Sequence, residues 1–430
     1  MARSTPISIA PVLLGLSVLT GATLPLPELA LKQSEHKKVG KLMGACVEAY
    51  IEREGRRDAE AELGEHLEKK WRKAGGDGGP LSLTEDLSEA LWYAVDYTKA
   101  KVRKGRVDEM EVPISYHGDH VATNAVWTPK KYSGKDKLPL IICIPDEGEA
   151  AEAHLDEHWN DPALRESAVL VALDMPETVE TWGTLGVRDD SSQVGGRTVL
   201  LMTYAELRRG YAIDFDRVFL AGRGAGVAAA MQMADASPDR FAGLVGRTGD
   251  AAEIGADNLG NLPMFFAGAG SRAEAYAEAA KEAGYAEVTL APDGGLPEAI
   301  AWMGETTRDS NPEKVVLRPG EMFTKSYWLE VPRQEYGEDA RITATCDRAS
   351  NTITLETEAV GPFEATLYFN DVMLDLDQPV KVVCNGAETT GTVPRNFNDM
   401  MNLVYKGRNE PGKLYTASRS YTVPGAASEE

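Results

Sequence analysis

The chain is short of basic residues and of cysteine, and each shortage excludes a class of function. Lys and Arg total 45 against 67 Asp and Glu, which gives a formal net charge of -22. A chain with this much negative charge is repelled by phosphate backbones and by anionic lipid. Nucleic acid is therefore not an expected partner. Only four cysteines occur in the 430 residues, with no CxxC spacing. A zinc ribbon or a thioredoxin-like site is therefore not expected.

Long apolar runs are also missing after the first residues. Residues 7–22 form one apolar stretch behind a single Arg, which is typical of a secretory signal peptide or an N-terminal anchor. We assign residues 1–24 to this segment and expect an exported protein, periplasmic or extracellular. No other stretch reaches the ~18 apolar residues of a membrane helix. In such a compartment Cys346 and Cys384, on two strand-like stretches, could pair as a disulfide.

Hydrophobic periodicity divides the rest of the chain into three parts. Residues 31–106 carry apolar side chains at three- and four-residue spacing, which predicts a helical domain or lid. Residues 107–308 alternate short apolar runs such as PLIICIP with helical stretches. This pattern predicts an α/β fold with a doubly wound, mostly parallel sheet. Residues 309–430 alternate with period two and contain the hairpin signal Asn385-Gly386, which predicts an antiparallel β-sandwich.

The stretch IDFDRVFLAGRGAG ends a strand in a tight glycine turn that opens a helix, and SPDRFAGLVGRTG follows with the next strand. Together with LPLIICIPDEGE further upstream, these segments resemble the α/β-hydrolase superfamily. The resemblance is to secreted esterases related to feruloyl esterase and polyhydroxybutyrate depolymerase, here in a multidomain bacterial type. It covers residues 107–308 and implies a catalytic triad presented on a nucleophile elbow.

The positions where the resemblance implies that triad hold residues that cannot act as nucleophile, acid or base, respectively. The elbow motif G-x-S-x-G aligns with Gly222 to Gly226, so the nucleophile position is Gly224. Ser271 stands where the resemblance implies the acid, and Gly295 lies in the turn where it implies the histidine. All six histidines lie at or before His158, upstream of the elbow. The oxyanion loop is also altered, because Pro145 removes a backbone donor and Asp146 and Glu147 add negative charge.

We therefore predict a non-catalytic homologue of the α/β-hydrolases that acts in binding or as a structural protein of the cell envelope. Its partner would be an unidentified protein, carbohydrate or polymer, and no cofactor is expected. Gly222, Arg223 and Gly224, with Asp146 and Glu147, form the candidate binding site, because a glycine turn at a helix N-terminus can hold an anion.

Two enzymatic alternatives stay open. One is a serine-type ester or peptide hydrolase with an unrecognised nucleophile. The other is a metal-dependent hydrolase, because His154 to His158 spells H-x-x-E-H, the order found in inverzincin metallopeptidases. His154 and His158 lie one helical turn apart and could both reach a zinc ion. The alternative to this metal site is that both histidines are simple helix-surface residues.

Overall fold

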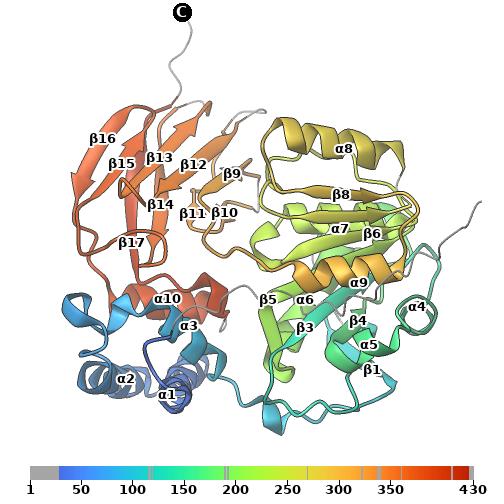
Figure 1. Ribbon diagram of the computed structural model, residues 1–430, viewed down its shortest axis with the longest axis horizontal. Coiled ribbons are helices and arrows are strands. Elements are labelled where there is room, and N and C mark those ends of the chain that lie inside the picture. The colour runs from blue at the N-terminus through green and yellow to red at the C-terminus, as the bar shows by residue number, and fades with distance from the viewer. Residues whose placement is uncertain are drawn as a thin grey trace, which may run out of the picture.

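The computed structural model describes residues 29–425, except residues 115–117, 119, 188–189, 191–192, 269, 321–322, 337–339, 360 and 408–409. The segment predicted as a signal peptide or anchor lies outside the described residues. Within the described part, no helix is both long enough and apolar enough to cross a membrane. Figure 1 shows the β-rich C-terminal part beside the central α/β part, with the N-terminal helices beneath the former.

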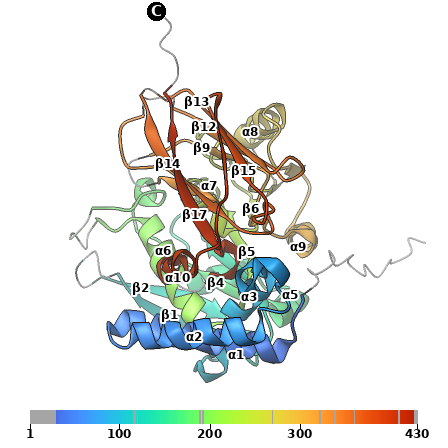
Figure 2. The ribbon, with the colours of Figure 1, turned by 90° about the vertical axis from the view of Figure 1, so that its left-hand side faces the viewer.

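The N-terminal helices share a core with a helix from the other end of the chain. They are α1 (Gln33–Glu52), α2 (Arg56–Lys70) and α3 (Thr84–Trp92). Their buried apolar faces pack around Trp71 and against Met400, Met401 and Val404 of α10 (Phe397–Gly407). In Figure 2, α10 lies above α1 and α2, and it contacts α6 (Gly196–Gly210) of the central part through the Arg208 side chain. The helical part therefore depends on C-terminal residues to complete its core.

The central part is built on one eight-stranded sheet with the order β1-β2-β4-β3-β5-β6-β7-β8. The strands are β1 (Val107–Pro113), β2 (Val121–Trp127), β3 (Leu138–Ile144), β4 (Val169–Ala172), β5 (Ile213–Arg223), β6 (Gly243–Arg247), β7 (Met264–Ala267) and β8 (Val288–Ala291). β2 runs antiparallel to both β1 and β4, and the pairs from β4 to β8 are parallel. The predicted doubly wound, mostly parallel sheet is confirmed.

Both faces of this sheet are covered by helices, as its apolar strands require. On β3, Leu140, Ile142 and Ile144 enter one core, while Ile141 and Cys143 enter the opposite one. The first core is closed by α6 (Gly196–Gly210), α7 (Ala225–Asp235) and α8 (Ser271–Glu282). The second is closed by α4 (Ala151–His158), α5 (Pro162–Ser167) and α9 (Leu296–Glu305).

The C-terminal part consists of two sheets around one core. One sheet has the order β16-β15-β13-β12-β9 and the other β10-β11-β14-β17. The strands are β9 (Lys314–Leu317), β10 (Lys325–Ser326), β11 (Leu329–Glu330), β12 (Ile342–Asp347), β13 (Thr352–Thr357), β14 (Phe363–Phe369), β15 (Val380–Cys384), β16 (Ala387–Gly391) and β17 (Ala417–Val423). Asn385 and Gly386 join β15 to β16 with φ of 43° and 84°, which confirms the predicted hairpin turn.

The expectation of a wholly antiparallel arrangement is wrong for one pair of strands. β13 and β15 pair in parallel, because the intervening strand β14 crosses to the other sheet. All four cysteines are buried and free, so the disulfide between Cys346 and Cys384 does not form. They lie on β12 and β15, and β13 lies between these strands. Strands are about 4.8 Å apart, so two spacings exceed the Cα separation of roughly 4.4–6.8 Å that a disulfide needs.

A buried ion pair joins the three parts where α9 ends. The Arg308 guanidinium donates to the Glu410 carboxylate at 2.5 Å, to the Asp216 carboxylate of β5 at 3.0 Å and to the Asp239 carbonyl at 2.8 Å. The side chains of Arg308 and Glu410 are 1% and 4% exposed. One residue after Glu410, the Pro411 carbonyl accepts a hydrogen bond from Ser88 of α3. Segments of all three parts therefore meet at this pair.

This junction predicts a loss of stability in acid. Burial alone would raise the pKa of Glu410, but Lys413, Arg308, Arg208 and Arg240 together lower it from 4.5 to about 2. A carboxylate with a depressed pKa contributes stability above its unfolded pKa, and that contribution is lost as the pH falls toward the folded value. Chemical denaturation should therefore show declining stability from about pH 4.5 to about pH 2. The Glu410→Gln variant should lose less over this interval; an equal loss in both proteins would contradict the assignment.

Candidate functional site

The candidate site lies where β3 and β5 end at the carboxyl edge of the central sheet. Strand β5 ends at Arg223, and Gly224 turns the chain into α7 with φ 53° and ψ -124°. Open α/β sheets bind their ligands at this edge. Both flanking glycines serve close packing, because a Cβ on Gly222 would lie 2.3 Å from the Gly226 carbonyl and one on Gly226 would lie 2.3 Å from the Ile144 carbonyl.

The space that a side chain at position 224 would need is occupied by a carboxylate. A Cβ placed on Gly224 would lie 2.0 Å from Cγ of Asp146 and 2.1 Å from each of its carboxylate oxygens. Asp146 comes from the loop after β3, which corresponds to the oxyanion loop in the resemblance. A serine at position 224 is therefore incompatible with Asp146 as it is placed.

The same carboxylate takes up the backbone donor that a hydrolase needs. In α/β-hydrolases the N–H of the residue after the nucleophile forms part of the oxyanion hole. Here that donor is the Ala225 N–H, and it donates to Asp146 Oδ1 at 2.9 Å. The Arg223 guanidinium lies 3.4 Å from Asp146 Oδ2. The anion expected at this helix N-terminus is thus supplied by the chain itself.

The loop that carries Asp146 is held by a second carboxylate, Glu149, which the sequence analysis did not single out. Glu149 accepts the Asp146 N–H at 3.0 Å, and its oxygens lie 2.8 Å from His154 Nδ1 and 2.9 Å from His158 Nε2. Burial opposes ionisation, but the Asp146 amide and the two histidines hold the pKa of Glu149 below its usual value. The sequence signal that could have pointed to Glu149 is its position, five residues before His154.

Glu149, His154 and His158 form a set that could hold a metal ion, since their ligand atoms all lie within 4.8 Å of one another. His154 is fully buried, so it is not a helix-surface residue. The Trp159 indole N–H donates to His154 Nε2 at 3.1 Å, which leaves the ring proton on Nδ1, facing Glu149. Metal binding through Nδ1 would move that proton to Nε2, against the indole donor. The tautomer therefore favours a hydrogen-bonded network over a ligand set.

The remaining predicted positions are scattered. Ser271 is the exposed first residue of α8, and Gly295 precedes α9, where its N–H donates to the Glu298 carboxylate. Glu147 is exposed, and its side chain has no ion pair among the described residues. Asp250, which sequence reasoning missed, lies beside the turn before Ser271, where the resemblance implies the acid. Its carboxylate accepts the Ala273 N–H at 2.9 Å. It therefore serves as a cap for α8.

No histidine in the described part of the chain forms a hydrogen bond to a hydroxyl or thiol group. His36 contacts the Asp86 carboxylate and His66 contacts Glu35, both within the helical part. His154 and His158 contact Glu149. His117 lies outside the described residues. A nucleophile paired with a base, which serine-type hydrolysis requires, is absent from the described residues.

Comparisons with known proteins find likenesses only among solved structures. No protein-family model matches the chain, and no curated protein sequence does. Among solved structures, a thermostable esterase is 15% identical, with 47% of this chain and 63% of that chain covered and a TM-score of 0.38. A ferulic acid esterase is 12% identical, with 47% and 94% covered and a TM-score of 0.37. An S-formylglutathione hydrolase from Agrobacterium tumefaciens is 13% identical, with 48% and 98% covered and a TM-score of 0.37.

The central part is α/β-hydrolase-like. This conclusion comes from the mixed sheet, with its antiparallel β2, and from the strand-turn-helix around Gly224. The solved esterases and hydrolases cover about half of the chain.

The packing of Gly224 against Asp146 can be tested by a double-mutant cycle. Gly224→Ala should lower the free energy of unfolding by about 2–5 kcal/mol, because it combines a strained φ with overpacking. In the Asp146→Gly background the same change should cost at least about 1 kcal/mol less. Gly284→Ala, at φ 67° after α8, is the matched control, because it carries the same backbone strain and a Cβ there meets nothing within 4 Å. Additive effects of the two changes in urea denaturation would contradict this arrangement.

Proposed function

We propose that this protein is a non-catalytic, α/β-hydrolase-like binding or structural protein of the cell envelope. One observation carries the proposal: the Asp146 carboxylate occupies the side-chain space of position 224 and accepts the Ala225 N–H. Catalysis of acyl transfer needs donors aimed at a developing oxyanion. A fixed carboxylate at that position both consumes a donor and repels negative charge.

The other parts of the chain supply surfaces for recognition. We infer that the two C-terminal sheets form a β-sandwich module, since they pack around one continuous core. The partner would be another protein, a carbohydrate or a polymer. Trp159, Trp182 and Trp328 offer no aromatic platform for a sugar, because they are buried, at 2%, 3% and 0% exposed. Recognition is therefore expected through polar and charged side chains.

The proposal predicts that the protein lacks esterase activity. Purified full-length protein should not turn over p-nitrophenyl acetate or butyrate, and a fluorophosphonate probe should not label it. The Gly224→Ser, Asp146→Gly double variant should stay inactive as well, because no described histidine lies in hydrogen-bond contact with a hydroxyl group. Stoichiometric labelling of any serine in the native protein would overturn the proposal and favour a hydrolase with an unrecognised nucleophile.

A metal-dependent hydrolase is the second candidate, favoured by the proximity of Glu149, His154 and His158. The indole of Trp159 opposes it, so we expect no tight zinc binding at this cluster. After incubation with Zn²⁺ and dialysis, elemental analysis should give the same low zinc content for the native protein and for His158→Ala. One zinc per chain that is lost in His158→Ala, together with turnover abolished by a chelator, would establish the metal alternative.

A further inference from the structure

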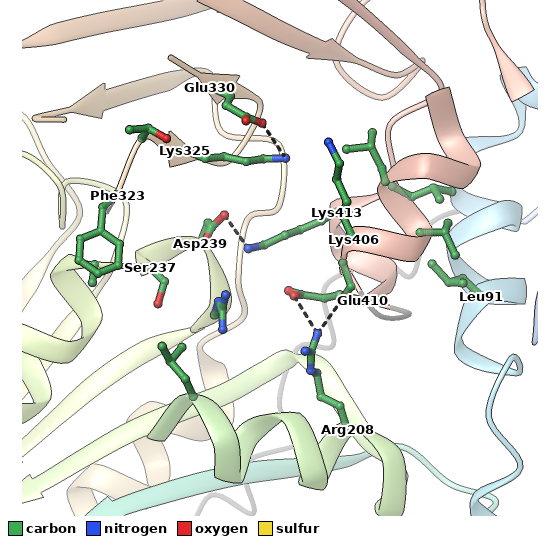
Figure 3. Close-up of a pocket in the computed structure, with 18 of the residues that line it drawn as sticks. Leu91, Arg208, Ser237, Asp239, Phe323, Lys325, Glu330, Lys406, Glu410 and Lys413 are labelled. Atoms are coloured by element: carbon green, nitrogen blue, oxygen red, sulfur yellow. Dashed lines mark hydrogen bonds and ion pairs between the residues drawn. The ribbon is translucent and has the colours of Figure 1, made fainter. Parts of the chain in front are cut away.

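A second polar site lies far along the chain from the elbow, in a cavity where the three parts of the molecule meet. The cavity has a volume of about 410 Å³, within the range of small-molecule sites, roughly 300–1,000 Å³. It is enclosed by α6, by η6 (Pro238–Arg240), by the β10–β11 hairpin, and by α10 with η7 (Pro411–Lys413). Figure 3 shows the charged side chains of these elements around it.

The cavity is cationic although the chain is acidic. Its cationic lining residues are Arg197, Arg208, Arg240, Lys325, Lys406 and Lys413, and its anionic ones are Asp239, Glu330 and Glu410. In a chain with a formal net charge of -22, six cations against three anions is a marked local reversal. Surface potentials of this kind concentrate ligands of the opposite charge.

The three lining carboxylates already have partners of their own. Glu410 is bound by Arg308, which lies outside the lining, at 2.5 Å. Asp239 contacts the Lys413 ammonium at 2.6 Å, and Glu330 accepts a hydrogen bond from the Tyr368 hydroxyl. The internal carboxylates therefore leave part of the positive charge in the cavity uncompensated.

Several cationic side chains here have at least one donor atom without a hydrogen-bonded acceptor. The nearest carboxylate oxygen to the Lys325 ammonium belongs to Glu330, at 3.9 Å, which is too long for a hydrogen bond. Nε of Arg197 and Nε of Arg208 are buried without a partner, while the terminal nitrogens of these side chains donate to the Gln232 and Gly407 carbonyls. The three carboxylates that line the cavity pair with Arg208, Arg308, Lys325 and Lys413, and none of them pairs with Arg240 or Lys406. Buried donors are normally satisfied, so the two Nε atoms point to an acceptor supplied from outside the chain, and the more exposed Lys325, Arg240 and Lys406 are available to bind the same acceptor.

The electrostatics of Lys325 agree with this geometry. Burial lowers its pKa to about 8, and Lys413 and Lys406 add to that effect, while Glu330 and Asp239 oppose it. The side chain also lies 3.9 Å from the centroid of the Tyr368 ring. A bound anion would stabilise the charged form of Lys325, so binding would be coupled to uptake of a proton.

We propose that this cavity binds a small ligand with several carboxylate or phosphate oxygens, recognised by Lys325, Lys406, Lys413 and Arg240. The ligand would bridge η6 and the β10–β11 hairpin to α10 and η7, because these cations come from those four elements. It would therefore clamp the C-terminal part to the central part, two of the three parts that meet at Arg308 and Glu410. This inference is independent of the absence of catalysis at the elbow.

Calorimetry with the full-length protein tests the site, with citrate as the tricarboxylate probe and pyrophosphate as the phosphate probe, at pH 7 and constant ionic strength. We expect saturable one-to-one binding of one or both probes. Stronger binding of citrate would assign a carboxylate ligand, and stronger binding of pyrophosphate a phosphate ligand. Binding of neither probe beyond the heat seen with added sodium chloride would overturn the proposal.

Lysine variants identify the cavity as the place of binding. Lys325→Gln should weaken binding by about tenfold or more, since a charge-assisted contact is lost, and Lys325→Arg should restore most of it. The matched control is Lys381→Gln, which removes the same charge from a lysine on β15 that is similarly exposed and pairs with Glu388. Affinity should also fall between pH 7 and pH 9. Equal loss in the Lys325→Gln and Lys381→Gln variants would refute the assignment.

Discussion

The buried pair of Arg308 and Glu410 is the interaction on which the arrangement of the three parts depends. A buried charge is costly unless it is paired and hydrogen-bonded, and Arg308 meets two carboxylates and a carbonyl from separate segments. Any rotation of the C-terminal part against the central sheet would leave one of these charges without its partner. The pair thus selects one relative orientation, and α10 is delivered from that orientation into the core of the N-terminal helices.

Much of the fold could be predicted from local patterns, because they report what each segment buries. The run PLIICIP on β3 is apolar on both faces, and the strand is covered on both faces. Asn385 and Gly386 accept positive φ, so the hairpin could be predicted from two letters. The parallel pairing of β13 and β15 and the docking of α10 onto α1–α3 carry no such local signature. Both result from packing between segments that are far apart in sequence.

The candidate site also has features that could be predicted from the sequence and features that could not. The residues that stand where the resemblance implies a nucleophile, an acid and a base belong to the sequence itself, so Gly224 and the lack of any histidine after His158 could be read directly. The position of the Asp146 carboxylate in the side-chain space of residue 224 could not be predicted in this way. Asp146 reaches Gly224 only when the loop after β3 lies against the start of α7. Likewise, the role of His154 depends on the Trp159 indole that fixes its tautomer. Neither contact follows a spacing rule.

The interlock of Gly224 with Asp146 also bears on the history of the chain. If an ancestor of this chain was a hydrolase, a return to its elbow would require a side chain at position 224 and removal of the carboxylate at position 146. Taken alone, the first step creates a steric clash, and the second leaves the first turn of α7 without its cap. Each single substitution is therefore expected to destabilise this turn, and the pair would restore its packing without restoring a triad. Because the two residues depend on each other, single mutations reach a serine at position 224 less readily than they reach changes elsewhere in the scaffold.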